Sequence, residues 1–151
     1  LGQKQLLQWM MLLVYTQAGS KLNTDLQQRV VNRAKFLELL SQQNDIGQPG
    51  ISDQAFMVGM LSLINQVTDL SLEEVLAQIP LAEQLQNGLL HREGLFGQLL
   101  NLADAIEAVN FDEMESIRKT LGLTAEQITN IQIQAIQWSN ELNSQINRAK
   151  A

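Results

Sequence analysis

Side chains able to perform acid–base or metal chemistry are few in this sequence. His91 is the only histidine, and it stands beside Arg92 and Glu93 in a predicted turn. Metal-dependent hydrolysis needs several His, Asp or Glu ligands around one ion, and no second histidine completes the usual sets. The same shortage leaves no serine or threonine with a histidine to activate it. We therefore interpret His91 as a surface or capping residue.

Two carboxylates and one glycine-containing stretch are the remaining candidates. Asp104 and Glu107 are three residues apart on a predicted helix, which places both carboxylates on one face. Helical di-iron sites also need a Glu-x-x-His element, which the sequence lacks, so we interpret the pair as a solvated acidic face. The stretch 94–97, Gly-Leu-Phe-Gly, is similar to a nucleotide-clamping loop, but that loop belongs to an RNA-binding domain with strands and a basic surround. We interpret the stretch as a turn that leads into a helix.

Composition and charge exclude several classes of protein. The 151 residues are 45% hydrophobic, which suffices for one domain with a substantial core, and the absence of cysteine excludes disulfides and thiolate metal sites. A net charge of −6 with scattered basic residues argues against nucleic-acid binding. The most apolar run, Trp9 to Tyr15, is far shorter than the roughly 20 residues that cross a bilayer. We expect no membrane association, no signal peptide and a cytoplasmic location, and the opening Leu1-Gly2 suggests a cut within a longer protein.

Helix signals recur along the whole chain, whereas the alternation typical of strands does not. Apolar residues follow a 3.6-residue period, and capping signatures stand at Thr24, Ser52, Ser71, Asp112 and Thr124. The expected helices cover about 3–16, 24–42, a stretch that includes 55–65, 71–79, 81–90, one that follows Gly94 and ends near Val109, 112–122, and one from Thr124 onward. The stretch 44–50, with two glycines and a proline, is expected to be a loop. The sequence therefore predicts an all-α protein, a compact multi-helix bundle of about eight helices.

Large and small residues on these helices indicate where the core lies. Met57 and Met60 are expected to fill the core, and the same holds for Met10 and Met11. Trp9 and Trp138 are interpreted as core anchors, with an interface role as the other reading. A glycine inside a helix costs about 1 kcal/mol relative to alanine, so Gly59 predicts the close approach of a neighbouring helix backbone.

Five stretches in order along the chain carry a resemblance to a known family. They are LGQKQLLQWMMLLVY, NRAKFLELL, SDQAFMVGMLSLINQV, LSLEEVLAQIPL and LFGQLLNLADAIEA. Together they resemble the HDOD domain, the HD-related output domain of bacterial signalling proteins, in the version that follows an EAL domain. The resemblance implies that residues 1–110 are the later part of an HDOD-like helical domain of HD ancestry. Residues 111–151 would be a C-terminal helical extension packed on it.

The helix that contains 55–65 carries the most informative difference from this family. In relatives that keep a trace of HD phosphohydrolase ancestry, it reads like A-F-L-A-G-L-L-H-D-I-G. The matching residues are Ala55, Phe56, Gly59 and Leu61. Ser62 stands at the histidine and Leu63 at the aspartate, so the resemblance implies that both metal ligands are lost. We therefore expect no catalytic residue, no metal, no other cofactor and no enzymatic activity.

The resemblance also implies a function and a set of partners. We expect a signalling module of cyclic di-GMP-linked signal transduction that acts through protein–protein contacts, with an attached or separate EAL domain as its partner. Self-association through an apolar face near Trp9 and Met10 is expected as well. Two alternatives stay open: a metal-dependent phosphohydrolase of HD type, and a helical-repeat scaffold, although no period of about 20 to 50 residues recurs.

Overall fold

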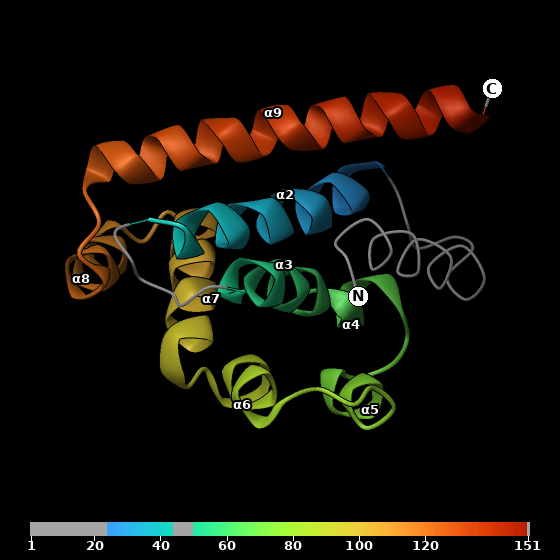
Figure 1. Ribbon diagram of the computed structural model, residues 1–151, viewed down its shortest axis with the longest axis horizontal. Coiled ribbons are helices and arrows are strands. Elements are labelled where there is room, and N and C mark those ends of the chain that lie inside the picture. The colour runs from blue at the N-terminus through green and yellow to red at the C-terminus, as the bar shows by residue number, and fades with distance from the viewer. Residues whose placement is uncertain (1–23, 44–49, 151) are drawn as a thin grey trace.

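The computed structural model describes residues 24–43 and 50–150, and within this part all regular structure is helical (Figure 1). The helices are α2 (Thr24–Ser41), α3 (Ile51–Leu61), α4 (Ile64–Val67), α5 (Leu72–Leu76), α6 (Glu83–His91), α7 (Gly94–Glu107), α8 (Phe111–Leu121) and α9 (Ala125–Lys150). The predicted all-α class is confirmed, although α4 and α5 are only about one turn long. The predicted helix at 3–16, with Trp9 and Met10, and residues 44–49 of the predicted loop lie outside the described residues.

Two of the predicted helix starts are confirmed by reciprocal capping hydrogen bonds. The Ser71 hydroxyl accepts a bond from the backbone N–H of Glu74, whose carboxylate accepts one from the N–H of Ser71. Before α9, the backbone N–H of Gln127 donates to Thr124 Oγ1, and the N–H of Thr124 donates to Gln127 Oε1. Each pair satisfies two backbone donors that the first turn of a helix leaves without a partner.

Two other predicted starts are wrong. Ser52 is not the N-cap of α3, because Gly50, with φ 89°, turns the chain earlier and the helix begins at Ile51. Asp112 does not cap α8, because Asn110 Oδ1 already accepts the backbone N–H of Glu113. In both cases a residue just upstream supplies the turn, so the serine and the aspartate fall within the first turn.

Helix α2 is central to the packing and lies between α9 and α3 (Figure 1). A Cβ on Gly59 of α3 would lie 2.7 Å from the Cα of Ala34 and 2.9 Å from the carbonyl oxygen of Arg33, both on α2. These atoms belong to the backbone and cannot move aside, so the two helices cross this closely only because residue 59 is glycine. The close approach predicted from Gly59 is confirmed.

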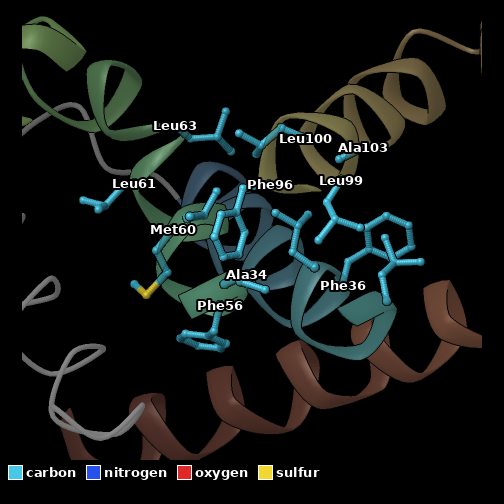
Figure 2. Close-up of a cluster of buried hydrophobic side chains, with 14 of the residues drawn as sticks. Ala34, Phe36, Phe56, Met60, Leu61, Leu63, Phe96, Leu99, Leu100 and Ala103 are labelled. Carbon is cyan, nitrogen blue, oxygen red and sulfur yellow. The ribbon is translucent and has the colours of Figure 1, made fainter. Parts of the chain in front are cut away.

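One hydrophobic core joins the early helices with α9. Figure 2 shows part of it, including Phe56, Leu63 and Leu100, and Met60 is also buried in it as predicted. The Trp138 ring on α9 meets Phe56 edge to face, with the ring centroids 5.9 Å apart, so its predicted role as a core anchor is supported. The predicted boundary between residues 110 and 111 stays a prediction.

The contact between α2 and α9 bears on the helical-repeat alternative. These helices are far apart in sequence and pack against each other along much of α2. In a solenoid each repeat contacts only its sequence neighbours, so the observed arrangement is not that of a stacked array. Within the described residues, no helix is both long and apolar enough to cross a membrane.

Candidate site: an arginine–carboxylate cluster

Ser62 and Leu63, where the resemblance places a lost metal-binding doublet, lie at the break between α3 and α4. The Ser62 hydroxyl donates to the carbonyl oxygen of Gly59 at 2.8 Å and is half-buried. Leu63 is 4% exposed and belongs to the hydrophobic core (Figure 2). At these two positions the chain therefore offers one hydroxyl, already bonded to the backbone, and one apolar side chain.

The side chain that reaches Ser62 is a buried arginine. Arg33 on α2 places Nη1 3.4 Å from Ser62 Oγ, and only 3% of its side chain is exposed. Its Nη2 lies 3.0 Å from Oδ1 of Asp104 and 2.7 Å from Oε2 of Glu107, both on α7. Hydrogen bonds between ionised groups at these distances are the strong ones. One guanidinium thus joins α2, α7 and the end of α3.

Two further arginines complete the group. Arg29, one turn before Arg33 on α2, places Nη2 3.4 Å from Oε2 of Glu107. Arg92, which follows α6, places Nη2 3.1 Å from Oδ2 of Asp104. We call these five residues the arginine–carboxylate cluster; they are Arg29, Arg33, Arg92, Asp104 and Glu107. Formally it holds three positive and two negative charges.

Two close backbone contacts bring the arginines into place. Gly59 allows α2 to approach α3 at Arg33, as described above. Gly97 does the same for Arg92, because a Cβ at residue 97 would lie 2.1 Å from the carbonyl carbon and oxygen of Arg92. Arg92 caps α6 in the left-handed region, at φ 56° and ψ 34°, where side chains other than glycine and asparagine are uncommon. The turn and the nearby glycine place its guanidinium beside α7.

The prediction that Asp104 and Glu107 form a solvated acidic face is supported in part, but it missed the arginines that bind both carboxylates. Their side chains remain 45% and 41% exposed, yet both bind guanidinium groups. The burial is asymmetric, because the arginine at the centre is almost entirely excluded from water while its partners are not. A buried cation needs anionic partners to offset the loss of its hydration. The ion pairs therefore matter more for Arg33 than for the two carboxylates, which keep contact with water.

The residues at this site do not fit a divalent metal ion. An ion at the carboxylates would compete with guanidiniums that already hold both of them, and it would add positive charge to a cluster that has an excess of it. Leu63 supplies no ligand atom. Within residues 24–43 and 50–150, no three or more His, Cys, Asp and Glu side chains converge as metal ligands would. That the protein binds no metal stays a prediction.

His91 and the stretch 94–97 flank Arg92 in the chain, but neither is part of the cluster as defined. His91 is exposed at the last position of α6, in agreement with a surface reading. The stretch 94–97 forms the first turn of α7, so its interpretation as the entry to a helix is supported. A sequence signal for the cluster existed: Arg29 and Arg33 are four residues apart on one helix, a spacing similar to that of the two carboxylates on another.

A groove beside the cluster follows the contact between α2 and α9. Its outer part, of about 300 Å³, is lined by Asp25, Gln28, Arg29, Asn32, Ile136 and Ser139. A second cavity of about 70 Å³ lies between α2, α7 and α9, and it shares Asn32 and Ile136 with the outer part. We call the two together the α2–α9 groove.

The molecule is thus an all-α domain in which a buried arginine joins the central helices. The sequence is 31% identical over 143 residues to the cyclic di-GMP phosphodiesterase CdgJ of Vibrio cholerae, a match that covers 95% of this chain and 33% of that protein. It is 25% identical over 145 residues to the uncharacterized protein YuxH of Bacillus subtilis, covering 94% of this chain and 34% of that protein. The chain therefore spans about a third of the length of these relatives. No family model matches it, and no solved structure matches it significantly.

These matches support one prediction and contradict another. Similarity to a protein named as a cyclic di-GMP phosphodiesterase supports a role linked to cyclic di-GMP. The prediction that the chain is not an enzyme is contradicted by the same match, because the relative is named as an enzyme. Ser62 and Leu63 bear on metal binding at these two positions alone, and they do not exclude an enzymatic activity elsewhere in the protein.

Proposed function

We propose that this chain is an HD-related output domain of a bacterial signalling protein linked to cyclic di-GMP. It acts through contacts with a phosphodiesterase domain of the EAL type, either attached to it or separate. The observation that carries the proposal is the match over 95% of the chain to a relative named as a cyclic di-GMP phosphodiesterase. Since the match covers 33% of that relative, the remaining length is ample for a domain that hydrolyses the dinucleotide.

The arginine–carboxylate cluster supports a role in transmitting contacts. Its ion pairs join α2, α7 and the turn after α6, so a displacement of one of these elements changes the contacts of the others. A partner that binds one arrangement of the helices more tightly than another shifts the population toward that arrangement. If the phosphodiesterase domain is that partner, the arrangement of the helices would set the rate at which this domain hydrolyses cyclic di-GMP.

Two exposed apolar side chains lie directly after the helix that carries the carboxylates. Val109, which is 61% exposed, lies in the connection between α7 and α8, and Phe111, which is 68% exposed, is the first residue of α8. Val109 also has a φ of 55°, a strained conformation for a β-branched residue. A partner that covers this pair contacts the chain two residues after Glu107, the end of α7, and therefore acts close to the cluster.

Cyclic di-GMP hydrolysis by the longer protein tests the proposal. Phe111→Ser is expected to change the rate severalfold while leaving the melting temperature of the protein unchanged, because the side chain is exposed. Ile133→Ser is the matched control, since Ile133 is another exposed apolar residue, 49% accessible, but lies on α9. Equal rates for the wild type and both variants would contradict control through this surface. A longer protein that fails to hydrolyse cyclic di-GMP would contradict the assignment to a phosphodiesterase system.

Self-association near Trp9 and Met10 is part of the proposal and has a separate test. We expect Trp9→Ser and Met10→Ser to shift the protein toward monomer in light scattering at high protein concentration. A wild-type protein that is monomeric under the same conditions would count against this interface.

A further inference from the structure

Helices α7 and α8 end in the same hydrogen-bonded turn, the Schellman motif. In each, two consecutive backbone N–H groups after the helix donate to carbonyl oxygens three and five residues earlier. The first of these donors lies in the left-handed region, where glycine is usual because it has no Cβ. The turn after α8 has Gly122 at this position, with φ 72°, whereas the turn after α7 has Val109, with φ 55°. Valine is strained in this conformation, so the reason for a valine here lies in its side chain.

Arg92 shows how a side chain at a left-handed position can be used. Within the described residues, Arg92 and Val109 are the two non-glycine residues with a positive φ. The Arg92 side chain works inside the molecule, because its Nη2 binds Asp104 at 3.1 Å. The Val109 side chain is 61% exposed, so packing in the core does not offset the strain of its backbone. A strained residue whose apolar side chain faces water is the pattern expected where another surface covers it.

Neighbouring residues enlarge the exposed apolar surface around Val109. Ala108 is exposed, and so is Phe111, the first residue of α8. Because consecutive Cα atoms are 3.8 Å apart, those of Val109 and Phe111 are separated by at most about 7.6 Å, and a surface that covers one reaches the other. We call Ala108, Val109 and Phe111 the α7–α8 patch. Figure 1 shows α8 at one edge of the molecule, where a second body can approach it.

Exposed carboxylates adjoin the α7–α8 patch. Asp112 and Glu113 follow Phe111 directly, in the first turn of α8, and both are exposed. Within the described part of the chain neither forms an ion pair, whereas Glu115 is held by Arg118 at 2.6 Å. A covering surface with basic side chains at its rim is attracted by the two carboxylates, and an acidic one is repelled.

We propose that the α7–α8 patch is the docking surface for a neighbouring domain that has an apolar pocket rimmed by lysine or arginine. Val109 and Phe111 enter the pocket, and Asp112 and Glu113 pair with the rim. The inference rests on the proposed function and specifies the chemistry of the partner, which is the phosphodiesterase domain of the same longer protein. A second copy of this chain fits less well, because a symmetric contact sets the carboxylates of the patch against each other in a chain of net charge −6.

Thiol labelling measures whether the patch is covered. The chain has no cysteine, so Ala108→Cys and Ala125→Cys each introduce one thiol at an exposed alanine, the first in the patch and the second at the start of α9. Mass spectrometry follows the labelled peptide in the isolated chain and in the longer protein. Ala108→Cys is expected to react about tenfold more slowly in the longer protein, because a covered thiol reacts only in the minor uncovered state. Ala125→Cys is expected to react equally in both. Equal rates for Ala108→Cys, or protection that appears in the isolated chain at high concentration, would overturn the inference.

Charge reversal tests the basic rim. Asp112→Lys in the longer protein is expected to speed the labelling of Ala108→Cys severalfold, because the new cation repels the rim. Glu126→Lys is the matched control, since Asp112 and Glu126 are each the second residue of a helix and both are exposed. The two variants lose the same favourable interaction with a helix dipole, but α8, about 16 Å long, separates Glu126 from the patch. Labelling that is unchanged by Asp112→Lys would contradict a basic rim.

Val109→Gly separates the strain from the contact. In the isolated chain it is expected to raise the melting temperature by about 2–4 °C, because glycine adopts this φ without strain. In the longer protein it is expected to speed the labelling of Ala108→Cys, because the valine no longer fills the pocket. A lower melting temperature of the isolated variant would show that the valine serves the fold, which would overturn the inference.

The outcomes distinguish this inference from the proposed function. A longer protein that hydrolyses cyclic di-GMP but leaves Ala108→Cys unprotected would contradict the docking surface and support the assignment to a phosphodiesterase system. A longer protein that protects Ala108→Cys but does not hydrolyse cyclic di-GMP would contradict that assignment and support a docking surface for a domain of another kind.

Discussion

Removing the two carboxylates of the arginine–carboxylate cluster is expected to destabilise the protein more than removing its central arginine. The side chain of Arg33 is 3% exposed, whereas those of Asp104 and Glu107 are 45% and 41% exposed. In an Asp104→Asn, Glu107→Gln double variant, the buried guanidinium loses both anionic partners. In Arg33→Met, each carboxylate still reaches water and a second arginine.

The structure sets the expected magnitudes. Breaking a buried ion pair by removing one partner costs about 3–5 kcal/mol, because an uncompensated charge remains buried. Since the new amide oxygens can still accept hydrogen bonds, we expect the lower end for the double variant, about 3 kcal/mol. Methionine keeps much of the apolar stem of Arg33 and has no charge to desolvate, so Arg33→Met is expected to cost about 1 kcal/mol or less.

Urea unfolding followed by circular dichroism measures these differences. Combining Arg33→Met with the double variant removes the stranded cation, and the triple variant is expected to recover most of the lost stability. Such non-additivity is the signature of residues that act as one network. If the double variant were no less stable than Arg33→Met, or if the effects simply added in the triple variant, the asymmetry argued from burial would be refuted.

Four other outcomes are expected. Gly59→Ala places a methyl group 2.7 Å from the α2 backbone and is expected to lower the free energy of unfolding in urea by about 3 kcal/mol. Gly122→Ala is the control, because φ is 72° there but the space is open, and it is expected to cost about 1 kcal/mol. Equal losses for the two variants would contradict the close contact as the cause. Thr124→Ala removes the cap of α9 and is expected to cost about 1 kcal/mol in the same assay, and a neutral result would show that this cap is dispensable. The hydrogen bond from Arg118, supported by its charge, lowers the pKa of Glu115, so the stability from this pair is present above the ordinary glutamate pKa and is lost as pH falls through the lowered value. In an NMR titration Arg118→Ala should return this pKa toward its ordinary range, and an unchanged value would contradict the cause. Addition of Mn²⁺, Mg²⁺ or Zn²⁺ is expected to leave the melting temperature unchanged, whereas a stoichiometric heat of binding would show a metal site that the cluster geometry does not fit.

Helix boundaries were predictable where both partners of a cap are close in the chain. The capping boxes at Ser71 and Thr124 each join residues three apart, so the signal is local and the structure agrees. The start predicted at Asp112 failed because Asn110 is an equally good cap and stands two residues earlier. The left-handed turn at Val109 decides between them, and a valine in that conformation is not expected from sequence.

The sequence predicted the two carboxylates of the cluster on one helix face but did not predict their arginine partners. The spacing of Asp104 and Glu107 correctly placed them on one face, but their partners come from α2 and from the turn after α6. Which helices meet depends on long-range packing, and a single sequence does not give it directly. Gly59 was a further local hint beside the spacing of Arg29 and Arg33, since it correctly required a close neighbour without identifying α2 as that neighbour.

A guanidinium in this position has mechanical consequences that a metal ion would not have. A metal can leave or exchange, whereas Arg33 is covalently part of α2 and cannot leave the protein. Its contacts to Glu107 and Asp104 are 2.7 and 3.0 Å, so a movement of α7 away from Arg33 by about 1 Å along these contacts would lengthen them beyond hydrogen-bonding range. The buried cation would then be unpaired, which makes intermediate positions of α7 unfavourable compared with a position that restores the pairs or one that exposes the arginine. Packed interfaces of this kind change between discrete arrangements rather than deforming gradually, and that is the property that a module acting through protein contacts requires.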